Sequence, residues 1–171
     1  MTTVIGLDLS LTAAGIAYPD GSATTIKTRL ADGDRRLLHI AAAVTDALDP
    51  HTTLAVIEDL PTHARSAGIT GMVHGAVRAA LLEHEVPYVL LAPATLKAYA
   101  TGKGNGDKTA MAMAAYKRAG VEFADDNACD AWWCRAAGLD QLGAPVVALP
   151  QAQRDRLSKA AWPVLIEQRS A

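Results

Sequence analysis

Short apolar runs along the chain indicate its strands, and the first of these runs is rich in β-branched residues. They are predicted over residues 3–9, 15–18, 23–28, 54–60 and 87–91. A Pro-Asp-Gly-Ser turn at 19–22 separates the second run from the third, and Pro61 stops the fourth. The first strand therefore leads into a hairpin, and two further strands follow later in the chain.

Apolar residues spaced three and four positions apart predict the helices. Three are expected over 32–48, 69–84 and about 125–142. Between the last two, one short helix begins at about 93 and another helix ends at about 119. Asp32 or Asp34 is placed to cap the first helix, and Pro50 is placed to end it. Trp132 and Trp133, in the last helix, are expected in the core.

The order of these elements predicts an α/β fold. Three strands form an antiparallel meander, and two more alternate with helices, so that they join the sheet in parallel through crossovers. We therefore expect a mixed five-stranded sheet with helices on its faces.

The length and composition predict one domain. The chain has 171 residues, half of them apolar, which is enough for one well-buried core. We expect this domain over 1–144, and a C-terminal extension with a short amphipathic helix over 145–171. Neither a run of about 20 apolar residues nor a signal-peptide pattern is present, so we expect a soluble cytoplasmic protein without a membrane partner. Cys129 and Cys134 fall on different helix faces, which argues against a disulfide or a zinc site.

The net charge of −2 argues against a nucleic-acid partner, because binding phosphates needs lysine and arginine. The distribution of charge changes this picture. Between Lys97 and Arg118 the chain carries five basic residues and the single acid Asp107. This segment forms either a basic surface beside an acidic site or an ordinary solvated face.

Two acids stand at strand ends. Asp8 ends the first predicted strand, and Glu58 follows the apolar run of the fourth. A carboxylate after such a run is costly to bury unless it is paired or bound to a metal. The plain alternative is that each acid caps a turn or faces solvent.

A third acidic cluster begins the helix predicted over 125–142. Helical spacing places Asn127 or Asp126 on the same face as Asp130, where two oxygen ligands can converge on a cation. Asp125 and Asp126 are also well placed to cap the helix, and this is the expected role of at least one of them. Together with the strand ends, the cluster offers the oxygen ligands of two hard divalent cations about 4 Å apart. Metal-dependent hydrolysis of a phosphodiester is the leading chemistry.

Other cofactors have weaker support. The five histidines are scattered and no paired set favours zinc, although His63 could approach a substrate from the segment after Glu58. The glycine-rich loop at 101–106 ends near Lys108-Thr109 but lacks the spacing of a phosphate-binding Walker loop. We therefore expect no nucleotide cofactor.

Five segments in order resemble the RuvC family of Holliday junction resolvases, which are crossover junction endodeoxyribonucleases of the ribonuclease H-like superfamily. The resemblance covers roughly residues 2 to 140. The segments are GLDLS at 6–10, IE at 57–58, APATLK at 92–97, the glycine loop to Asp-Lys at 102–108, and NACDA at 127–131.

The resemblance implies a ribonuclease H-like fold and a metal site formed by Asp8, Glu58, Asn127 and Asp130. The third of these positions is often an acid or histidine in the family, so Asn127 is a departure, and Asp126 is an alternative ligand. Magnesium is the implied cofactor, with manganese as a substitute.

The resemblance also implies a DNA substrate. Lys97 and Lys108 match lysines near the substrate phosphates, with Lys108 close to the reacting group and Lys103 in the glycine-rich loop beside the backbone. Branched, four-way DNA and a homodimer are the implied partners. Three glycines and Ala79 place small residues along one side of the helix at 69–84. This side would allow either a partner subunit or the sheet of the same chain to approach the helix closely.

Three alternatives remain open on the sequence alone. One is a different ribonuclease H-like nuclease that acts on RNA or RNA–DNA hybrids. Another is a catalytically inactive DNA-binding relative, which Asn127 would explain. The third, an actin-like or sugar-kinase ATPase, needs two such domains and more chain than is present here.

Overall fold

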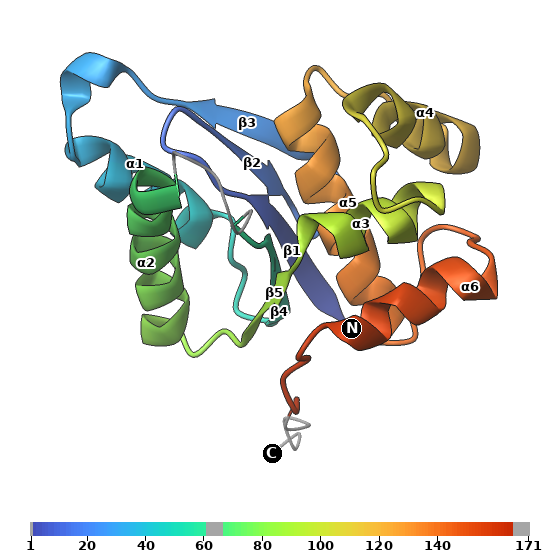
Figure 1. The fold of residues 1–171 in the computed structure, drawn as a ribbon. Coiled ribbons are helices and arrows are strands. Elements are labelled where there is room, and N and C mark those ends of the chain that lie inside the picture. The colour runs from blue at the N-terminus through green and yellow to red at the C-terminus, as the bar shows by residue number, and fades with distance from the viewer. Residues whose placement is uncertain (1, 61–66, 166–171) are drawn as a thin grey trace.

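The computed structural model describes residues 2–60 and 67–165, and in this part the predicted α/β fold is confirmed. One mixed sheet of five strands has the order β3-β2-β1-β4-β5 (Figure 1). The strands are β1 (Thr3–Asp8), β2 (Ala13–Ala17), β3 (Ala23–Lys27), β4 (Thr52–Glu58) and β5 (Tyr88–Leu91). β1, β2 and β3 form the antiparallel meander, while β4 and β5 join β1 in parallel, as the element order predicts.

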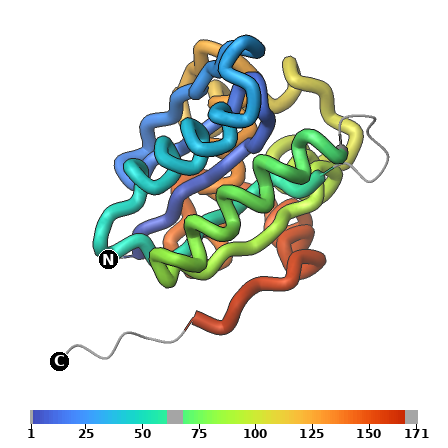
Figure 2. The backbone as a smooth tube through the Cα atoms, turned by 90° about the vertical axis from the view of Figure 1, so that its left-hand side faces the viewer, coloured from blue at the N-terminus to red at the C-terminus, as the bar shows by residue number. Residues whose placement is uncertain are grey.

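Helices cover both faces of the sheet. The helical elements are η1 (Leu30–Asp32), α1 (Arg35–Asp46), α2 (Ala67–Glu83), α3 (Pro93–Thr101), α4 (Lys108–Ala119), α5 (Asp126–Gln141), α6 (Gln151–Arg154) and η2 (Asp155–Lys159). α1 and α2 lie side by side on one face, and Figure 2 shows them in front of the sheet. α5 crosses the other face and contacts β1, β2, β3 and β4.

The alternation of side chains along the strands divides the core into two layers. Val4 and Val56 pack beneath α5 with Trp132 and Trp133, which lie in the core as predicted. Ile5 and Leu7, on the opposite face of β1, pack beneath α1 and α2. Each strand of the sheet center is thus buried on both faces, which explains the continuous apolar runs of β1 and β4.

The start predicted for the first helix is found at Asp34, one of the two predicted capping residues, whereas the helix ends before the predicted Pro50. Asp34 is the N-cap of α1, but its side chain makes no capping hydrogen bond, and Asp32 instead pairs with Arg29. The helix ends at Asp46, well before Pro50, and its last turn closes through the backbone N–H of Ala47.

Several of the residues between 146 and 165 pack against the body of the domain. Val147 and Leu157 are buried in the core layer beneath α5, and α6 and η2 contact α3. The buried Gln153 donates from Nε2 to the backbone oxygen of Tyr99 at 2.7 Å. The division into a domain over 1–144 and an extension over 145–171 stays a prediction.

Among the described residues, no helix is both long enough and apolar enough to cross a membrane. Cys129 and Cys134 are free and buried.

Candidate active site

Asp8 and Glu58 are brought together by the pairing of β1 with β4. The two strands are parallel neighbours with Leu7 opposite Ile57, and each ends at its acid. Parallel strands end at the same edge of a sheet, so both carboxylates project at one place. The prediction that each acid ends a strand is confirmed.

The third carboxylate comes from α5, and two glycines in the sheet allow this helix to approach closely. A Cβ atom at Gly6 would lie 2.0 Å from the backbone oxygen of Ala131, and one at Gly15 would lie 2.1 Å from that of Asn127. Any side chain at these positions would push the helix away from the sheet. The close contact between α5 and the sheet determines how near Asp130 lies to the ends of β1 and β4.

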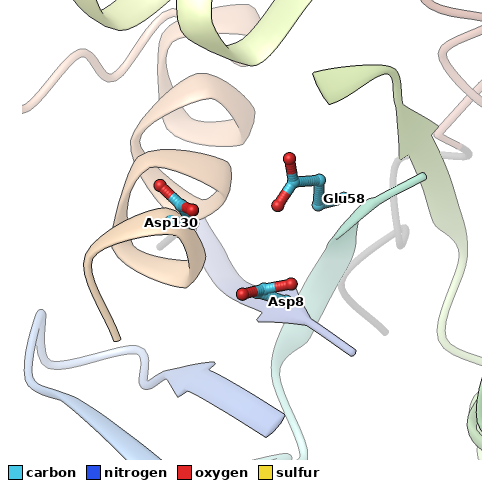
Figure 3. A group of neighbouring side chains, drawn as sticks. All are labelled: Asp8, Glu58 and Asp130. Atoms are coloured by element: carbon cyan, nitrogen blue, oxygen red, sulfur yellow. The ribbon is translucent and has the colours of Figure 1, made fainter. Parts of the chain in front are cut away.

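Asp8, Glu58 and Asp130 form the carboxylate cluster. One oxygen from each residue lies within 4.8 Å of the other two. Figure 3 shows the three side chains converging from two strand ends and one helix. Each is half-buried, which leaves access for a ligand.

Burial and mutual repulsion make the charged form of the cluster unfavourable. Burial, and then the charge of Asp130, raises the pKa of Asp8 to about 7, while burial and the charge of Asp8 raise the pKa of Glu58 to about 8. Burial, followed by the charge of Asp126, raises the pKa of Asp130 to about 6. Within the part of the chain that the structure describes, no hydrogen bond or salt bridge reaches these three carboxylates.

This donor set fits a divalent cation bound by oxygen ligands. Carboxylates this close and this poorly compensated are stabilised when a hard cation binds between them. The three residues that the sequence singles out at strand and helix ends are therefore those that the structure can offer to a metal. Their role as ligands remains a prediction.

Two of the three lysines named from the resemblance face the cluster. The charge of Lys97, on α3, lowers the pKa values of Glu58 and Asp130, and the charge of Lys108, at the start of α4, lowers those of Asp8 and Asp130. Lys103 lies exposed in the loop between α3 and α4.

The remaining acids of the α5 cluster have other partners. Asp125 is the N-cap of the helix and accepts a hydrogen bond from the backbone N–H of Ala128 at 3.1 Å, so the prediction of a capping acid is confirmed. Asp126 forms an ion pair with Lys108 and is not part of the three-residue cluster. Asn127 is half-buried in the first turn of α5, and its place as a fourth ligand stays a prediction.

Sequence reasoning missed two contributors to the site. Thr25 of β3 donates from Oγ1 to Asp125 at 2.5 Å and so ties the start of α5 to the sheet. Gly6 was recognised only as part of a motif, although an isolated glycine inside a strand signals close backbone approach. His63 lies outside the described residues.

Comparison with known proteins agrees with this geometry, although no family model matches the chain. Two relatives are named crossover junction endodeoxyribonuclease RuvC. The protein from Paenarthrobacter aurescens (strain TC1) is 31% identical over 63% of this chain and 64% of its own length. The protein from Nocardia farcinica (strain IFM 10152) is 28% identical over 98% of this chain and 97% of its own length.

Solved structures identify the fold. Thermus thermophilus RuvC superposes with a TM-score of 0.68 at 21% identity, covering 86% of this chain and all of that one. A second structure of that protein, in complex with a Holliday junction substrate, matches equally well. The chain thus has a ribonuclease H-like fold with an acidic cluster suited to a metal. It is similar in sequence to relatives named RuvC, one of them over 98% of its length, and shares the fold of the Thermus thermophilus protein.

Proposed function

We propose that this chain is a structure-selective endonuclease that resolves four-way DNA junctions, or related branched DNA, by metal-dependent hydrolysis of phosphodiester bonds. The observation that carries the proposal is the carboxylate cluster of Asp8, Glu58 and Asp130, whose oxygens lie within 4.8 Å of one another. The names of the relatives and the junction complex of a structural neighbour support the choice of DNA substrate.

The cluster would hold magnesium, or manganese in its place, with Asn127 as a fourth oxygen ligand. Such cations activate a water and stabilise the leaving oxygen of a phosphodiester. Asn127 offers a carbonyl oxygen but no charge and no basic group, so it can complete the site and cannot accept a proton. Asp126, held by Lys108, is less suited to that position.

The lysines around the cluster would hold the DNA. Lys97 and Lys108 bring positive charge to the carboxylates, as their effects on the pKa values of Glu58 and Asp8 show. Lys108, whose side chain is 76% exposed, is free to exchange Asp126 for a substrate phosphate near the reacting bond. Lys103 would contact the backbone from the neighbouring loop.

We also propose a homodimer, because two symmetric strands of a junction must be cut. The side of α2 that carries Gly68, Gly71 and Gly75 supports this assembly. Counting the atoms of residues 2–60 and 67–165, a Cβ atom at Gly68 or Gly75 would meet none within 4 Å, and one at Gly71 would meet Leu60 at 3.9 Å. These glycines therefore leave room on α2 and are not used for close packing on the sheet.

Cleavage of labelled DNA tests the proposal. A four-way junction, a linear duplex, a flap and an RNA–DNA hybrid are incubated with magnesium, manganese or a chelator. We expect paired symmetric cuts on the junction that disappear with the chelator. Asp8→Asn should reduce cleavage by about three orders of magnitude, or about 4 kcal/mol, because a charged ligand is lost.

Asp46→Asn is the matched control, since Asp46 is an exposed carboxylate at the end of α1, on the other face of the sheet. It should cut like the wild type. Preference for the hybrid would replace the proposed substrate with RNA-containing duplexes. Tight junction binding without cutting in either metal would instead indicate an inactive relative, with Asn127 as the first residue to replace by Asp.

A further inference from the structure

A second charged feature lies away from the carboxylate cluster. A hollow of about 420 Å³ opens between the end of β3, η1 and the start of α1. It is lined by Lys27, Thr28, Arg29, Asp32, Arg35, Arg36 and His39. Four permanently cationic side chains thus face one carboxylate in a chain whose net charge is −2.

Arg36 gives this hollow a built interior. Its relative exposure is 9%, and its Nε donates to the backbone oxygen of Gly33 at 2.8 Å. Among the described residues, the two terminal nitrogens of its guanidinium have no hydrogen-bond partner. Neither terminal nitrogen is counted among the buried atoms without a partner, so both remain accessible to a ligand that enters from solvent.

The carboxylate in the lining is already engaged. Asp32 accepts from Arg29 through both oxygens, from Nε at 3.2 Å and from Nη2 at 3.0 Å. Arg36 therefore keeps its charge for a ligand. Lys27 and Arg35 are exposed beside it and add two further cations within the same lining.

The hollow lies at the end of the sheet that carries the carboxylate cluster. β3 runs antiparallel to β2 with Lys27 opposite Ala13, and β2 is in turn antiparallel to β1, whose last residue is Asp8. The segment that leads from β3 to α1 follows directly, as Figure 1 shows. Lys27 thus marks the same sheet end as Asp8.

The start of α5 lies near both features. The charge of Lys27 lowers the pKa of Asp125, the N-cap of α5, whose side chain also accepts from Thr25. The same helix carries Asp130. A DNA strand that leaves the cluster over the start of α5 would therefore meet Lys27 and then the hollow.

We propose that this hollow is a binding site for a backbone phosphate of a duplex arm, with Arg36 as its buried anchor and Lys27 and Arg35 as its exposed cations. Arginine binds phosphate oxygens through two parallel N–H groups, which suits the free terminal nitrogens of Arg36. The site does not discriminate between DNA sequences, because phosphate contacts fix only the position and orientation of the protein on the DNA. It rests on the proposed function, since the ligand is DNA.

Equilibrium binding tests this site without cleavage. Fluorescent junction and linear duplex are titrated with the full chain in chelator at several salt concentrations. Lys27→Glu and Arg35→Glu, both at exposed positions, should each weaken binding about tenfold at 0.1 M salt and lower the salt slope by about one. The loss should be the same on both DNAs, because the contact is to an arm.

Lys159→Glu is the matched control, since Lys159 is exposed on η2, which packs against α3. It should change the dissociation constant less than twofold. Arg36→Gln probes the anchor, and its thermal unfolding is measured beside binding to separate lost affinity from lost structure. Weaker binding with an unchanged melting temperature supports the anchor.

The results separate this site from the proposed function. If the wild type binds and cuts junctions while Lys27→Glu and Arg35→Glu bind like Lys159→Glu, the site is wrong and the function stands. A loss confined to the junction overturns the assignment to a duplex arm. If the wild type binds neither DNA, the proposed function and this site fail together.

Discussion

Asp130 and Asp140 stand on the same helix, and their surroundings are opposite. Asp140, with a side-chain exposure of 3%, accepts from Arg154 at 2.8 and 2.6 Å and from the hydroxyl of Tyr99 at 3.1 Å. Asp130 has no such partner among the described residues, and it lies beside the carboxylates of Asp8 and Glu58. One end of α5 thus neutralises its acid within the protein, while the other end leaves the charge for a ligand.

The difference shows how burial of the same residue serves two purposes. A buried carboxylate with charge-assisted hydrogen bonds holds parts of the structure together, here α3, α5 and α6. A buried carboxylate beside others of its kind destabilises the fold unless something positive binds. Groups that oppose folding in this way mark functional sites.

The largest expected effect separates the two acids by matched substitutions. Asp130→Asn should reduce junction cleavage by about a thousandfold and leave the free energy of unfolding equal or higher, because an unpaired charge is removed. Asp140→Asn should lower the free energy of unfolding by about 2 kcal/mol, because charged hydrogen bonds in a buried place are lost. Single-turnover cleavage and urea unfolding measure the two quantities on the same samples.

Loss of cleavage in a folded Asp140→Asn protein would contradict the purely structural role of Asp140. Asp140 would then act on the carboxylate cluster through α3, which carries both Tyr99 and Lys97. Unfolding of Asp130→Asn at a lower urea concentration than the wild type would contradict the claim that the charge of Asp130 opposes folding.

The two acids also differ in how far the sequence predicts them. Asp8 and Glu58 are visible because each ends an apolar run, and Asp130 because it follows acids at a helix start. These are local patterns, and the sheet topology then brings the three together. The strands and helices were predicted for the same reason, since their periodicity is local.

The partners of Asp140 leave no such pattern. Tyr99 lies 41 residues away, and Arg154 belongs to a segment whose purpose the sequence did not reveal. The hollow around Arg36 leaves no such pattern either, because its lining residues come from the end of β3, η1 and the start of α1 and meet only in the folded chain. Asp34 is the N-cap residue of α1 as predicted, but its side chain makes no capping hydrogen bond, because local polar residues have several possible partners.

A smaller effect is expected where α5 meets the sheet. Gly15→Ala places a Cβ 2.1 Å from the backbone oxygen of Asn127, so the first turn of α5 must move and Asp130 with it. Displacement of a ligand by about 1 Å costs on the order of a hundredfold in rate. Cleavage per folded molecule, with folding followed by circular dichroism, measures this loss.

Gly138→Ala is the matched change near the other end of α5. Its Cβ would meet side-chain atoms of Val56 and Val4 at 2.7 and 2.8 Å, so overpacking should cost about 1–3 kcal/mol in stability. The cluster end of the helix stays in place, and cleavage per folded molecule should remain within twofold. Equal losses of cleavage in both variants would mean that α5 moves as a rigid unit.

The last expected effect is a pH dependence of stability that runs opposite to that of most carboxylates. The pKa values of Asp130, Asp8 and Glu58 are raised to about 6, 7 and 8, so the folded chain binds more protons than the unfolded chain between pH 4 and pH 8. Stability is then highest at the acid end of this window and falls as the pH rises through it. In chelator we expect stability to fall progressively between pH 5 and pH 8, measured by urea unfolding.

This last experiment returns to the two acids of α5. Asp130→Asn should flatten the pH dependence, because it removes one titrating group and part of the repulsion on Asp8. Asp140→Asn should instead lower stability through the loss of its hydrogen bonds from Arg154 and Tyr99. Magnesium should oppose the loss at pH 8, because a cation binds the deprotonated carboxylates. If stability in chelator instead rises toward pH 8, the cluster is neutralised within the protein as Asp140 is, and the contrast between the two ends of α5 is lost.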